Sequence, residues 1–170
     1  MRLNELCVLE EQLLDAARHN RRAFRSGVVE LDEFLQSYAT QQIKKGVTAV
    51  RVLVEASAPA EILGYYSLSA AQIEVEALTE SLRKKLPRYP LPCFRMGRLA
   101  VGKSMQGRGL GAILIGLAVS RCLEARQHVA SFALLVDAKD ERAKLFYEHH
   151  GFTACIGQPL SLFLALGDFK

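Results

Sequence analysis

The stretch GRLAVGKSMQGRGLGAILI, residues 97–115, constrains the fold of this chain more than any other segment. Its apolar start predicts a strand, Gln106–Gly111 form a glycine-rich loop, and the apolar run after the loop predicts a helix. Glycines let the chain turn so that successive N–H groups face one point, and the helix N-terminus adds its dipole. The segment therefore predicts a cradle for an anionic group, with Lys103 and Arg108 placed to reinforce a pyrophosphate.

This loop does not fit the dinucleotide-binding fingerprint. That fingerprint has the form G-x-G-x-x-G near the first strand of a βαβ unit, with an acidic residue ~20 residues further on. Here Gly107, Gly109 and Gly111 give G-x-G-x-G, late in the chain. A glycine turn before a helix is common, so the loop alone identifies no ligand.

The rest of the chain alternates between strand and helix patterns, which predicts one mixed α/β domain over residues 1–170. This length is ordinary for a single domain, and no linker, repeat or low-complexity tract interrupts it. The expected strands span residues 47–55, 62–70, 93–101, 131–136, 152–156 and 160–166. The expected helices span residues 26–38, 79–86, 110–127 and 141–149, and residues 6–18 are expected to form a short apolar lead and then a helical piece.

Composition argues against several classes of protein. The longest apolar run, Leu110–Val119, is far shorter than the ~20 residues that cross a bilayer. The first fifteen residues carry acids where a signal peptide would have a basic end and an apolar run, so we expect a cytoplasmic protein with no membrane contact. The cysteines are widely spaced, which predicts reduced thiols and no metal site. They are Cys7, Cys93, Cys122 and Cys155.

The charge is unevenly distributed along the chain. Residues 81–123 contain nine basic residues and no acid, so the rest of the chain has a net charge of −5 against +4 for the whole. A segment of one sign is typical of proteins that bind a polyanion, either nucleic acid or a phosphate-bearing cofactor. A solvated basic helix face is the alternative interpretation.

Two motifs in order resemble the GNAT family of acyl-CoA N-acyltransferases. The first is Q-x-x-G-x-G at Gln106, Gly109 and Gly111, and the second is AKLFYEHHGF at residues 143–152. Residues 93–155 follow the family's order of elements. The resemblance implies a central, mostly antiparallel sheet with flanking helices, and acetyl-CoA as the cofactor. It places the cofactor at Leu99, Ala100, Val101, Gln106, Gly107, Arg108, Gly109, Leu110, Gly111, Ala112, Ala143 and Phe146.

The same resemblance implies a mechanism of direct transfer. The backbone of Leu99–Val101 would pair with the pantetheine arm and polarise the thioester carbonyl, and an amine would attack it in a ternary complex. Tyr147 would protonate the departing thiolate; the alternative is a helix tyrosine that only packs on the last strands. Many members have Asn where this chain has Asp140, which makes a cofactor role for Asp140 doubtful. His149 and His150 are expected to be structural or exposed.

Most of the chain is similar to a narrower group, the GNAT toxins of bacterial toxin–antitoxin pairs. Those toxins acetylate the α-amine of the amino acid on charged tRNA and so block translation. Gly102 departs from that group, in which an acid commonly follows GRLAV, and we expect activity to survive the change. The similar segments lie at residues 24–35, 64–70, 86–92, 97–101, 136–152 and 161–166.

A tRNA substrate would need a cationic surface near the active site. The sequence offers Lys84, Lys85 and Arg88 for that contact, with Arg22 as an extension, although part of the basic charge could serve the phosphates of CoA alone. An α-amine titrates near ~7.7–8.0, so water can take its proton, whereas a lysine substrate would need a base. Loops around residues 65–69 and 86–91 are expected to form the pocket for the amino-acid side chain.

The toxin resemblance also implies partners. These are a ribbon-helix-helix antitoxin that covers the active site or cofactor groove, operator DNA bound through the antitoxin, and a second copy of the chain in a homodimer. Two other functions stay open. One is a GNAT enzyme that acts on a protein N-terminus or a small amine, although cationic aminoglycosides would prefer a more acidic groove. The other is a non-catalytic module that senses CoA or binds nucleic acid.

Overall fold

The computed structural model describes residues 8–167, which divide into two compact units. Unit 1 consists of the residues up to Leu68 together with Arg98–Leu117. Unit 2 consists of Ser69–Gly97 and the residues from Ala118 onward. This division does not test the expectation of a single domain over residues 1–170, which stays a prediction.

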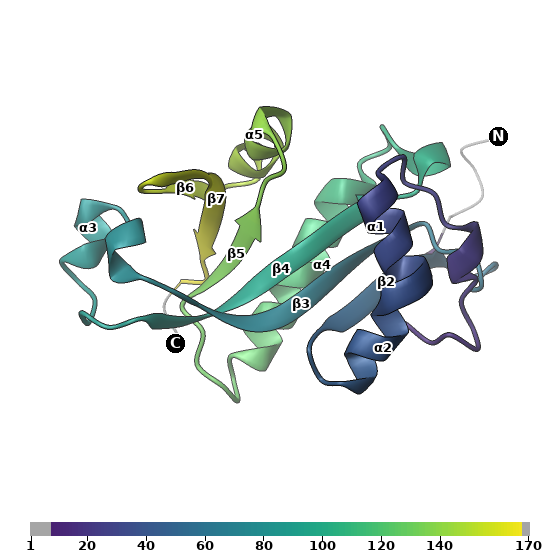
Figure 1. The fold of residues 1–170 in the computed structure, drawn as a ribbon, viewed down its shortest axis with the longest axis horizontal. Coiled ribbons are helices and arrows are strands. Elements are labelled where there is room, and N and C mark those ends of the chain that lie inside the picture. The colour runs from purple at the N-terminus through teal and green to yellow at the C-terminus, as the bar shows by residue number, and fades with distance from the viewer. Residues whose placement is uncertain (1–7, 168–170) are drawn as a thin grey trace. The chain divides into compact units, whose positions relative to one another are not determined.

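Seven strands pair in the order β1-β2-β3-β4-β5-β7-β6 (Figure 1). The sheet is mixed and mostly antiparallel, with β4 and β5 parallel, as predicted. Three elements run from one unit into the other: β3 (Gly64–Ile73), β4 (Leu91–Val101) and α4 (Leu110–Ala125). Each matches an element expected from the sequence to within three residues at either end.

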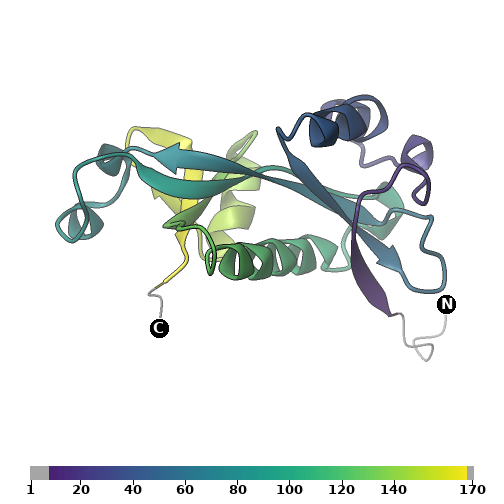
Figure 2. The ribbon, with the colours of Figure 1, turned by 90° about the horizontal axis from the view of Figure 1, so that it is seen from below.

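In unit 1, the helical layer packs against β2 (Ala49–Glu55). It consists of α1 (Val29–Glu33), a π-helical turn η2 (Phe34–Tyr38) and α2 (Ala39–Lys44), so the helix expected from residue 26 extends further than predicted. Its apolar side chains bury against alternate residues of β2, because a strand presents every second side chain to one face. Figure 2 shows α1 and α2 on one side of these strands and α4 on the other. The buried set includes Phe34, Leu35, Ala39, Val50, Val52 and Val54.

The helical piece expected within residues 6–18 is wrong, because Leu9–Leu13 form the edge strand β1. This strand pairs antiparallel with β2. Glu11 accepts a hydrogen bond from Arg51 at 2.9 Å and another from the Tyr66 hydroxyl at 2.8 Å. Its partners lie 40 and 55 residues further along the chain, so local sequence did not reveal the strand.

Three elements of unit 1 approach one another closely at Gly64, through the backbone of β4 and a side chain of α4. A Cβ atom built on Gly64 would lie 2.9 Å from the carbonyl oxygen of Ala100 on β4 and 3.0 Å from Cδ1 of Leu114 on α4. Contacts that short exclude a side chain. Glycine therefore lets β3, the end of β4 and the start of α4 meet.

In unit 2, β4 pairs in parallel with β5 (Ala133–Asp137), from Cys93 opposite Ala133 to Met96 opposite Val136. β5 pairs antiparallel with β7 (Gln158–Ala165), and β7 pairs with β6 (Thr153–Cys155) across a bulge. α5 (Glu141–His149) has the bounds predicted from the sequence. The remaining elements are η3 (Val75–Ala77) and the one-turn α3 (Glu80–Arg83), with η1 (Arg21–Ala23) and η4 (Lys103–Met105) in unit 1.

The thiols of Cys93, Cys122 and Cys155 are free and buried, as predicted, and Cys7 lies outside the described residues. Burial raises the pKa of Cys93 to about 11 and that of Cys122 to about 12. Both thiols therefore stay protonated at neutral pH and act as small apolar side chains. Within residues 8–167, no helix is long and apolar enough to span a membrane.

We expect Gly64→Ala to lower the free energy of unfolding by about 1–3 kcal/mol, because the new methyl group overpacks the contact with β4 and α4. Gly116→Ala is the matched control, since Gly116 lies in α4 with open space around its Cβ position. That change should stabilise the protein by about 0.4–1 kcal/mol. Urea unfolding of both variants tests the pair, and equal effects would contradict the close packing at Gly64.

Candidate active site

The glycine-rich loop has the backbone of an anion cradle. Gly107 and Gly109 have φ angles of +79° and +81°, which side chains other than glycine rarely adopt. No atom lies within 4 Å of a Cβ built on either residue, so glycine is needed here for its backbone conformation and not for space. Leu110 is buried and anchors the start of α4, where the first-turn amides have no helical carbonyl to bind. Arg108 is exposed beside these amides.

Gln106 ties this loop to the rest of unit 1. Its side-chain amide donates to the carbonyl oxygen of Ser26 at 2.6 Å and to that of Val101 at 3.0 Å. Ser26 is held in turn by the buried carboxylate of Asp32, which accepts from the Ser26 amide at 2.8 Å and from its hydroxyl at 2.6 Å. The amide of Lys103 also donates to the carbonyl of Arg25, at 2.7 Å. Gln106 therefore positions the loop, and its amide group is engaged with protein carbonyls.

The end of β4 leads directly into the loop. Leu99, Ala100 and Val101 follow the part of β4 that pairs with β5 in the register from Cys93 to Met96. Ala100 is buried in the core of unit 1, whereas its two neighbours are half-buried. Their backbone lies in the segment expected to face the pantetheine arm, and that role stays a prediction.

Gly102 is packed too tightly for a larger residue to enter freely. It is buried, its amide donates to the carbonyl oxygen of Leu63 at 2.7 Å, and a Cβ would come within 3.1 Å of that oxygen. The turn at Gly102 therefore lies against Leu63 and leaves little room for a side chain.

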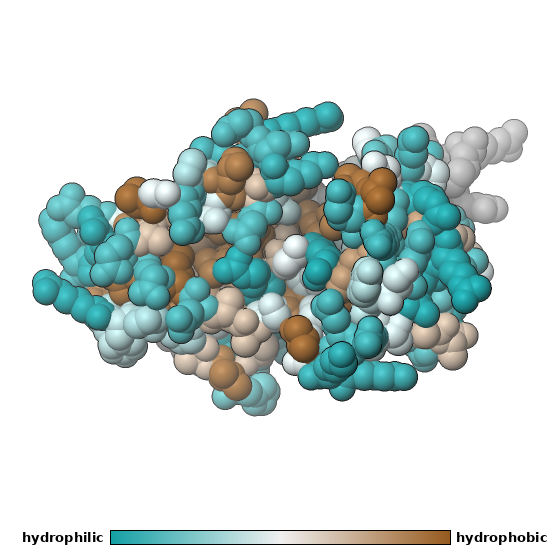
Figure 3. Space-filling view, viewed as in Figure 1, coloured by the Kyte–Doolittle hydropathy of each residue, from teal (hydrophilic) through white to brown (hydrophobic). Residues whose placement is uncertain are grey.

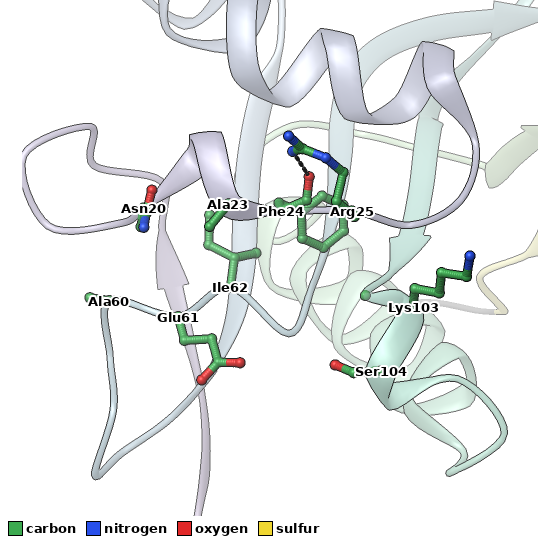
Figure 4. A pocket seen from close by; sticks show the side chains of 10 residues that line it. Asn20, Ala23, Phe24, Arg25, Ala60, Glu61, Ile62, Lys103 and Ser104 are labelled. Carbon is green, nitrogen blue, oxygen red and sulfur yellow. Dashed lines mark hydrogen bonds between the residues drawn. The ribbon is translucent and has the colours of Figure 1, made fainter.

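A cavity of about 670 Å³ lies beside this turn, which forms part of its wall (Figure 4). Phe24 and Ile62 form its apolar wall, and Arg25, Glu61 and Lys103 lie on its rim. The Arg25 guanidinium is turned back onto the carbonyl oxygen of Phe24, at 2.8 Å. Because the rim carries both signs of charge, it favours a bare anion less than the glycine-rich loop does.

In unit 2, the C-terminus of α5 fixes Tyr147. The amide of Phe152 donates to the carbonyl of Tyr147 at 3.1 Å, and that of Gly151 donates to Glu148 at 3.0 Å. Gly151 has a φ angle of +93°, which completes a Schellman motif. The rings of Phe152 and Tyr147 pack edge to face with centroids 5.5 Å apart, which is the apolar contact of that motif. The motif Y-x-x-x-G-F is therefore a helix cap built around the tyrosine.

The N-terminus of α5 explains Asp140. Its carboxylate accepts a hydrogen bond from the amide of Ala143 at 2.8 Å, which makes it the N-cap of the helix. Asn and Asp serve equally well at this position, so the exchange from the family's Asn keeps the cap. Phe146 stacks edge to face on Tyr147 and on His150, and His149 is exposed.

The Tyr147 side chain is buried, with 8% of its surface exposed. Burial raises the pKa of Tyr147 to about 12, and the nearby carboxylate of Asp137 adds to the rise. The phenol therefore stays protonated throughout the physiological range, which is the state that a proton donor needs. Asp137 was not singled out from the sequence, although it lies in the toxin-like segment 136–152.

The predicted tRNA contacts are all exposed. Arg22 lies in η1 of unit 1, whereas Lys84, Lys85 and Arg88 follow α3 in unit 2. Figure 3 shows mainly hydrophilic side chains over α3 on the face in view. Lys84 approaches Glu80 at 3.6 Å, an exposed pair that contributes little to stability.

Two other basic side chains of unit 1, which were not predicted to contact tRNA, contact other parts of the protein. Arg21 donates to Thr40 at 2.5 Å, and the guanidinium of Arg98 lies 3.5 Å from the centre of the Phe34 ring.

Residues 65–69, which were expected to be a loop at the side-chain pocket, lie instead in strand β3 (Gly64–Ile73). Tyr65, Tyr66 and Ser67 are buried in β3. Tyr65 donates to the carbonyl oxygen of Leu31 at 2.6 Å, and Tyr66 is bonded to Glu11. These hydrogen bonds hold both tyrosine rings in the core strand.

Comparison with known families decides the class of protein. The model of the acetyltransferase (GNAT) domain matches residues 49–154. The chain belongs to the GNAT acetyltransferase family. It is 31% identical over 148 residues to a tRNA-acetylating toxin of Mycobacterium tuberculosis (strain ATCC 25618 / H37Rv), covering 87% of each chain.

Solved structures of GNAT toxins share the fold over nearly the whole chain. AtaT complexed with acetyl-methionyl-tRNAfMet is 30% identical, with a TM-score of 0.87 over 93% of this chain and 95% of that one. A tyrosine-to-phenylalanine mutant of AtaT, bound to the C-terminus of the antitoxin AtaR and to acetyl-CoA, has 26% identity and a TM-score of 0.80, with 93% of each chain covered. The AtaT–AtaR complex bound to DNA has 26% identity and a TM-score of 0.74, with 92% of this chain and 94% of that one covered.

As a GNAT enzyme, this chain is an N-acetyltransferase that uses acetyl-CoA, and the geometry of its loop fits that cofactor. The cradle offers open, positive-φ glycines and first-turn amides where a pyrophosphate needs donors. Ser26 and Asp32 are positioning residues that motif reasoning missed, although both lie in the toxin-like segment 24–35.

We expect Gln106→Met to weaken acetyl-CoA binding by about tenfold, because the loss of two hydrogen bonds, each contributing about 0.5–1.5 kcal/mol, frees the loop. Calorimetric titration with acetyl-CoA measures the effect. Gln127→Met is the matched control, since Gln127 is exposed after the end of α4. Equal affinities for the two variants would contradict a positioning role for Gln106.

Proposed function

We propose that this chain is the toxin of a toxin–antitoxin pair, and that it transfers the acetyl group of acetyl-CoA to the α-amine of aminoacyl-tRNA, which blocks translation. The observation that carries the proposal is the extent of the likeness. It covers 87% of the chain in the tRNA-acetylating relative and 93% in AtaT with its acetylated tRNA, well beyond the 49–154 segment common to GNAT domains.

The residues of the site support direct transfer. The thioester of acetyl-CoA supplies the acetyl group, and the loop amides of Gly107–Ala112 hold its pyrophosphate. As the N–C bond forms and the C–S bond breaks, Tyr147 donates its phenolic proton to the leaving sulfur. The raised pKa keeps this proton in place until that step, and the caps of α5 hold the ring.

The exposed basic residues supply the tRNA contact. Lys84, Lys85 and Arg88 follow a one-turn helix and are exposed to solvent, where they can approach phosphates, and Arg22 contributes from unit 1. Lysine and arginine contacts to phosphates supply affinity through the release of counterions, without reading sequence.

The proposal extends to the partners. AtaT binds the antitoxin AtaR, and AtaT and AtaR together bind DNA. By that likeness, this chain is inhibited by an antitoxin of the ribbon-helix-helix class, which leads any binding to operator DNA. We further propose that the toxin works as a homodimer in the cytoplasm, where its tRNA substrate is found.

We expect incubation with total charged tRNA and labelled acetyl-CoA to yield N-acetyl-aminoacyl-adenosine after nuclease digestion, detected by mass spectrometry. Tyr147→Phe should lower kcat by about 100-fold or more without changing acetyl-CoA affinity, because general acid catalysis contributes about 10²–10⁴-fold. Tyr38→Phe, an exposed helix tyrosine in unit 1, is the control. Label on a peptide or small amine, with none on tRNA, would overturn the toxin proposal and leave the acetyltransferase.

We expect combined replacement of Lys84, Lys85 and Arg88 by Ala to weaken tRNA binding and to reduce the salt dependence of log Kd by about two, since each lost phosphate contact removes about 0.7–0.9 from the slope. Replacement of Lys44 and Lys45, which are exposed at the end of α2, serves as the control. Titrations of tRNA at several salt concentrations test the change. An unaltered slope would remove these residues from the tRNA surface.

A further inference from the structure

Arg98 lies on β4 just before the segment that leads into the glycine-rich loop. Its guanidinium carbon is 3.5 Å from the centre of the Phe34 ring, the first residue of η2. Alternate residues of a strand face the same side, and Ala100, two residues further on, is buried in the same cluster as Phe34. Arg98 therefore faces the helical layer of unit 1, beside the end of β4.

The ring beneath Arg98 is a fixed platform. Phe34 is buried and stacks on Tyr65, with ring centroids 6.3 Å apart and ring planes at 25°. Tyr65 is buried in turn, and its hydroxyl donates to the carbonyl oxygen of Leu31 at 2.6 Å. A guanidinium that rests on such a ring is already oriented, so it loses less freedom for each hydrogen bond that it forms to a ligand.

The guanidinium of Arg98 has unused hydrogen-bond donors. Within residues 8–167 it donates no hydrogen bond and forms no ion pair. Asp32, the buried acid of the same helical layer, is bonded to Ser26 instead. At 3.5 Å from the ring centre the guanidinium plane lies along the ring, so its N–H groups point past the edge of Phe34. A half-buried cation in this state is suited to an anion supplied by a ligand.

The position of Arg98 indicates which ligand supplies that anion. Direct transfer requires the acceptor and the thioester to meet beside Leu99–Val101. The pyrophosphate of CoA belongs at the first amides of α4, and α4 lies on the opposite side of the strands from α1 (Figure 2). The face on which Arg98 lies is therefore left to the acceptor. In aminoacyl-tRNA the amino acid is esterified to the ribose of the terminal nucleotide, and the phosphodiester before that nucleotide is the anion nearest to the ester.

We propose that Arg98 binds the terminal phosphodiester of aminoacyl-tRNA and so places the aminoacyl ester beside β4. This inference rests on the proposed function and adds a substrate-binding residue close to the ester. The planar guanidinium can donate to two phosphate oxygens at once, whereas the exposed Lys84 and Lys85 act as point charges.

The test pairs a change in the protein with a change in the substrate. The full chain is given labelled acetyl-CoA and a charged tRNA that it acetylates, with the terminal phosphodiester either native or replaced by an uncharged methylphosphonate. We expect the methylphosphonate to lower kcat/KM of the unaltered protein by about tenfold or more, because hydrogen bonds between charged groups are the stronger class. Arg98→Met should lower kcat/KM for native tRNA by a similar factor and should remove the penalty of the methylphosphonate.

Two further variants complete the test. Arg18→Met removes the same charge from an exposed position of unit 1 and should keep the full methylphosphonate penalty. Methionine can still pack on the Phe34 ring, so Arg98→Met should fold. Should it not, Arg98→Lys keeps the charge without the planar fork, and its methylphosphonate penalty should fall between those of the unaltered protein and of a protein without the contact.

Calorimetric titration with acetyl-CoA separates the two sources of phosphate. Arg98→Met should bind acetyl-CoA as tightly as the unaltered protein does. Weaker binding of acetyl-CoA, with the methylphosphonate penalty intact, would assign Arg98 to the phosphates of CoA and overturn the proposal. An equal loss of kcat/KM on both tRNAs would show that Arg98 only packs on Phe34, and would overturn it as well.

These outcomes also separate this inference from the proposed function. Acetylation of charged tRNA with the same methylphosphonate penalty in Arg98→Met would overturn the role of Arg98 while the proposed function stands. Failure of the unaltered protein to acetylate any charged tRNA would overturn the proposed function, and this inference with it.

Discussion

The conformation of the glycine-rich loop depends on the two hydrogen bonds that the side-chain amide of Gln106 donates. Two glycines with positive φ angles give the loop its shape, and the same glycines leave it free to sample other conformations. Gln106 removes that freedom by bonding to Ser26 and Val101, and Asp32 holds Ser26 from behind. Gln106, which the family resemblance places at the cofactor, is thus engaged with carbonyl oxygens of the protein and orders the backbone of the loop.

Much of the fold could be predicted because its signals are local. The bounds of α5 follow from an N-cap residue and a glycine, and β2 follows from a run of valines. β1 could not be predicted, because its Glu11 is stabilised by Arg51 and Tyr66 from distant strands. The π-helical turn at Phe34–Tyr38 likewise has no signal in the helical spacing of its apolar residues.

The residues of the candidate site could be predicted where they belong to a sequence motif that also shapes the backbone. Tyr147 was singled out through the family motif at residues 143–152, and the glycine and phenylalanine of that motif form the Schellman cap of α5. Asp137 was missed because its role comes from the pairing of β5 with β4 and β7, which brings Arg95 and Ser161 to its carboxylate.

The balance of protons favours an α-amine as the acceptor. Tyr147, with a pKa of about 12, is a weak acid. Its proton transfers to the departing thiolate only where the negative charge that develops on the sulfur is poorly solvated.

The attacking amine must lose a proton in the same reaction. Within unit 2, both carboxylate oxygens of Asp137 are already engaged, one by Arg95 and the other by Ser161. An aminoacyl ester lowers the pKa of its α-amine below the usual ~7.7–8.0, so much of it is already neutral and water can accept the proton as the bond forms. A lysine side chain, at ~10.4, would arrive protonated. The side chains around Tyr147 therefore suit an acceptor that brings its own free amine.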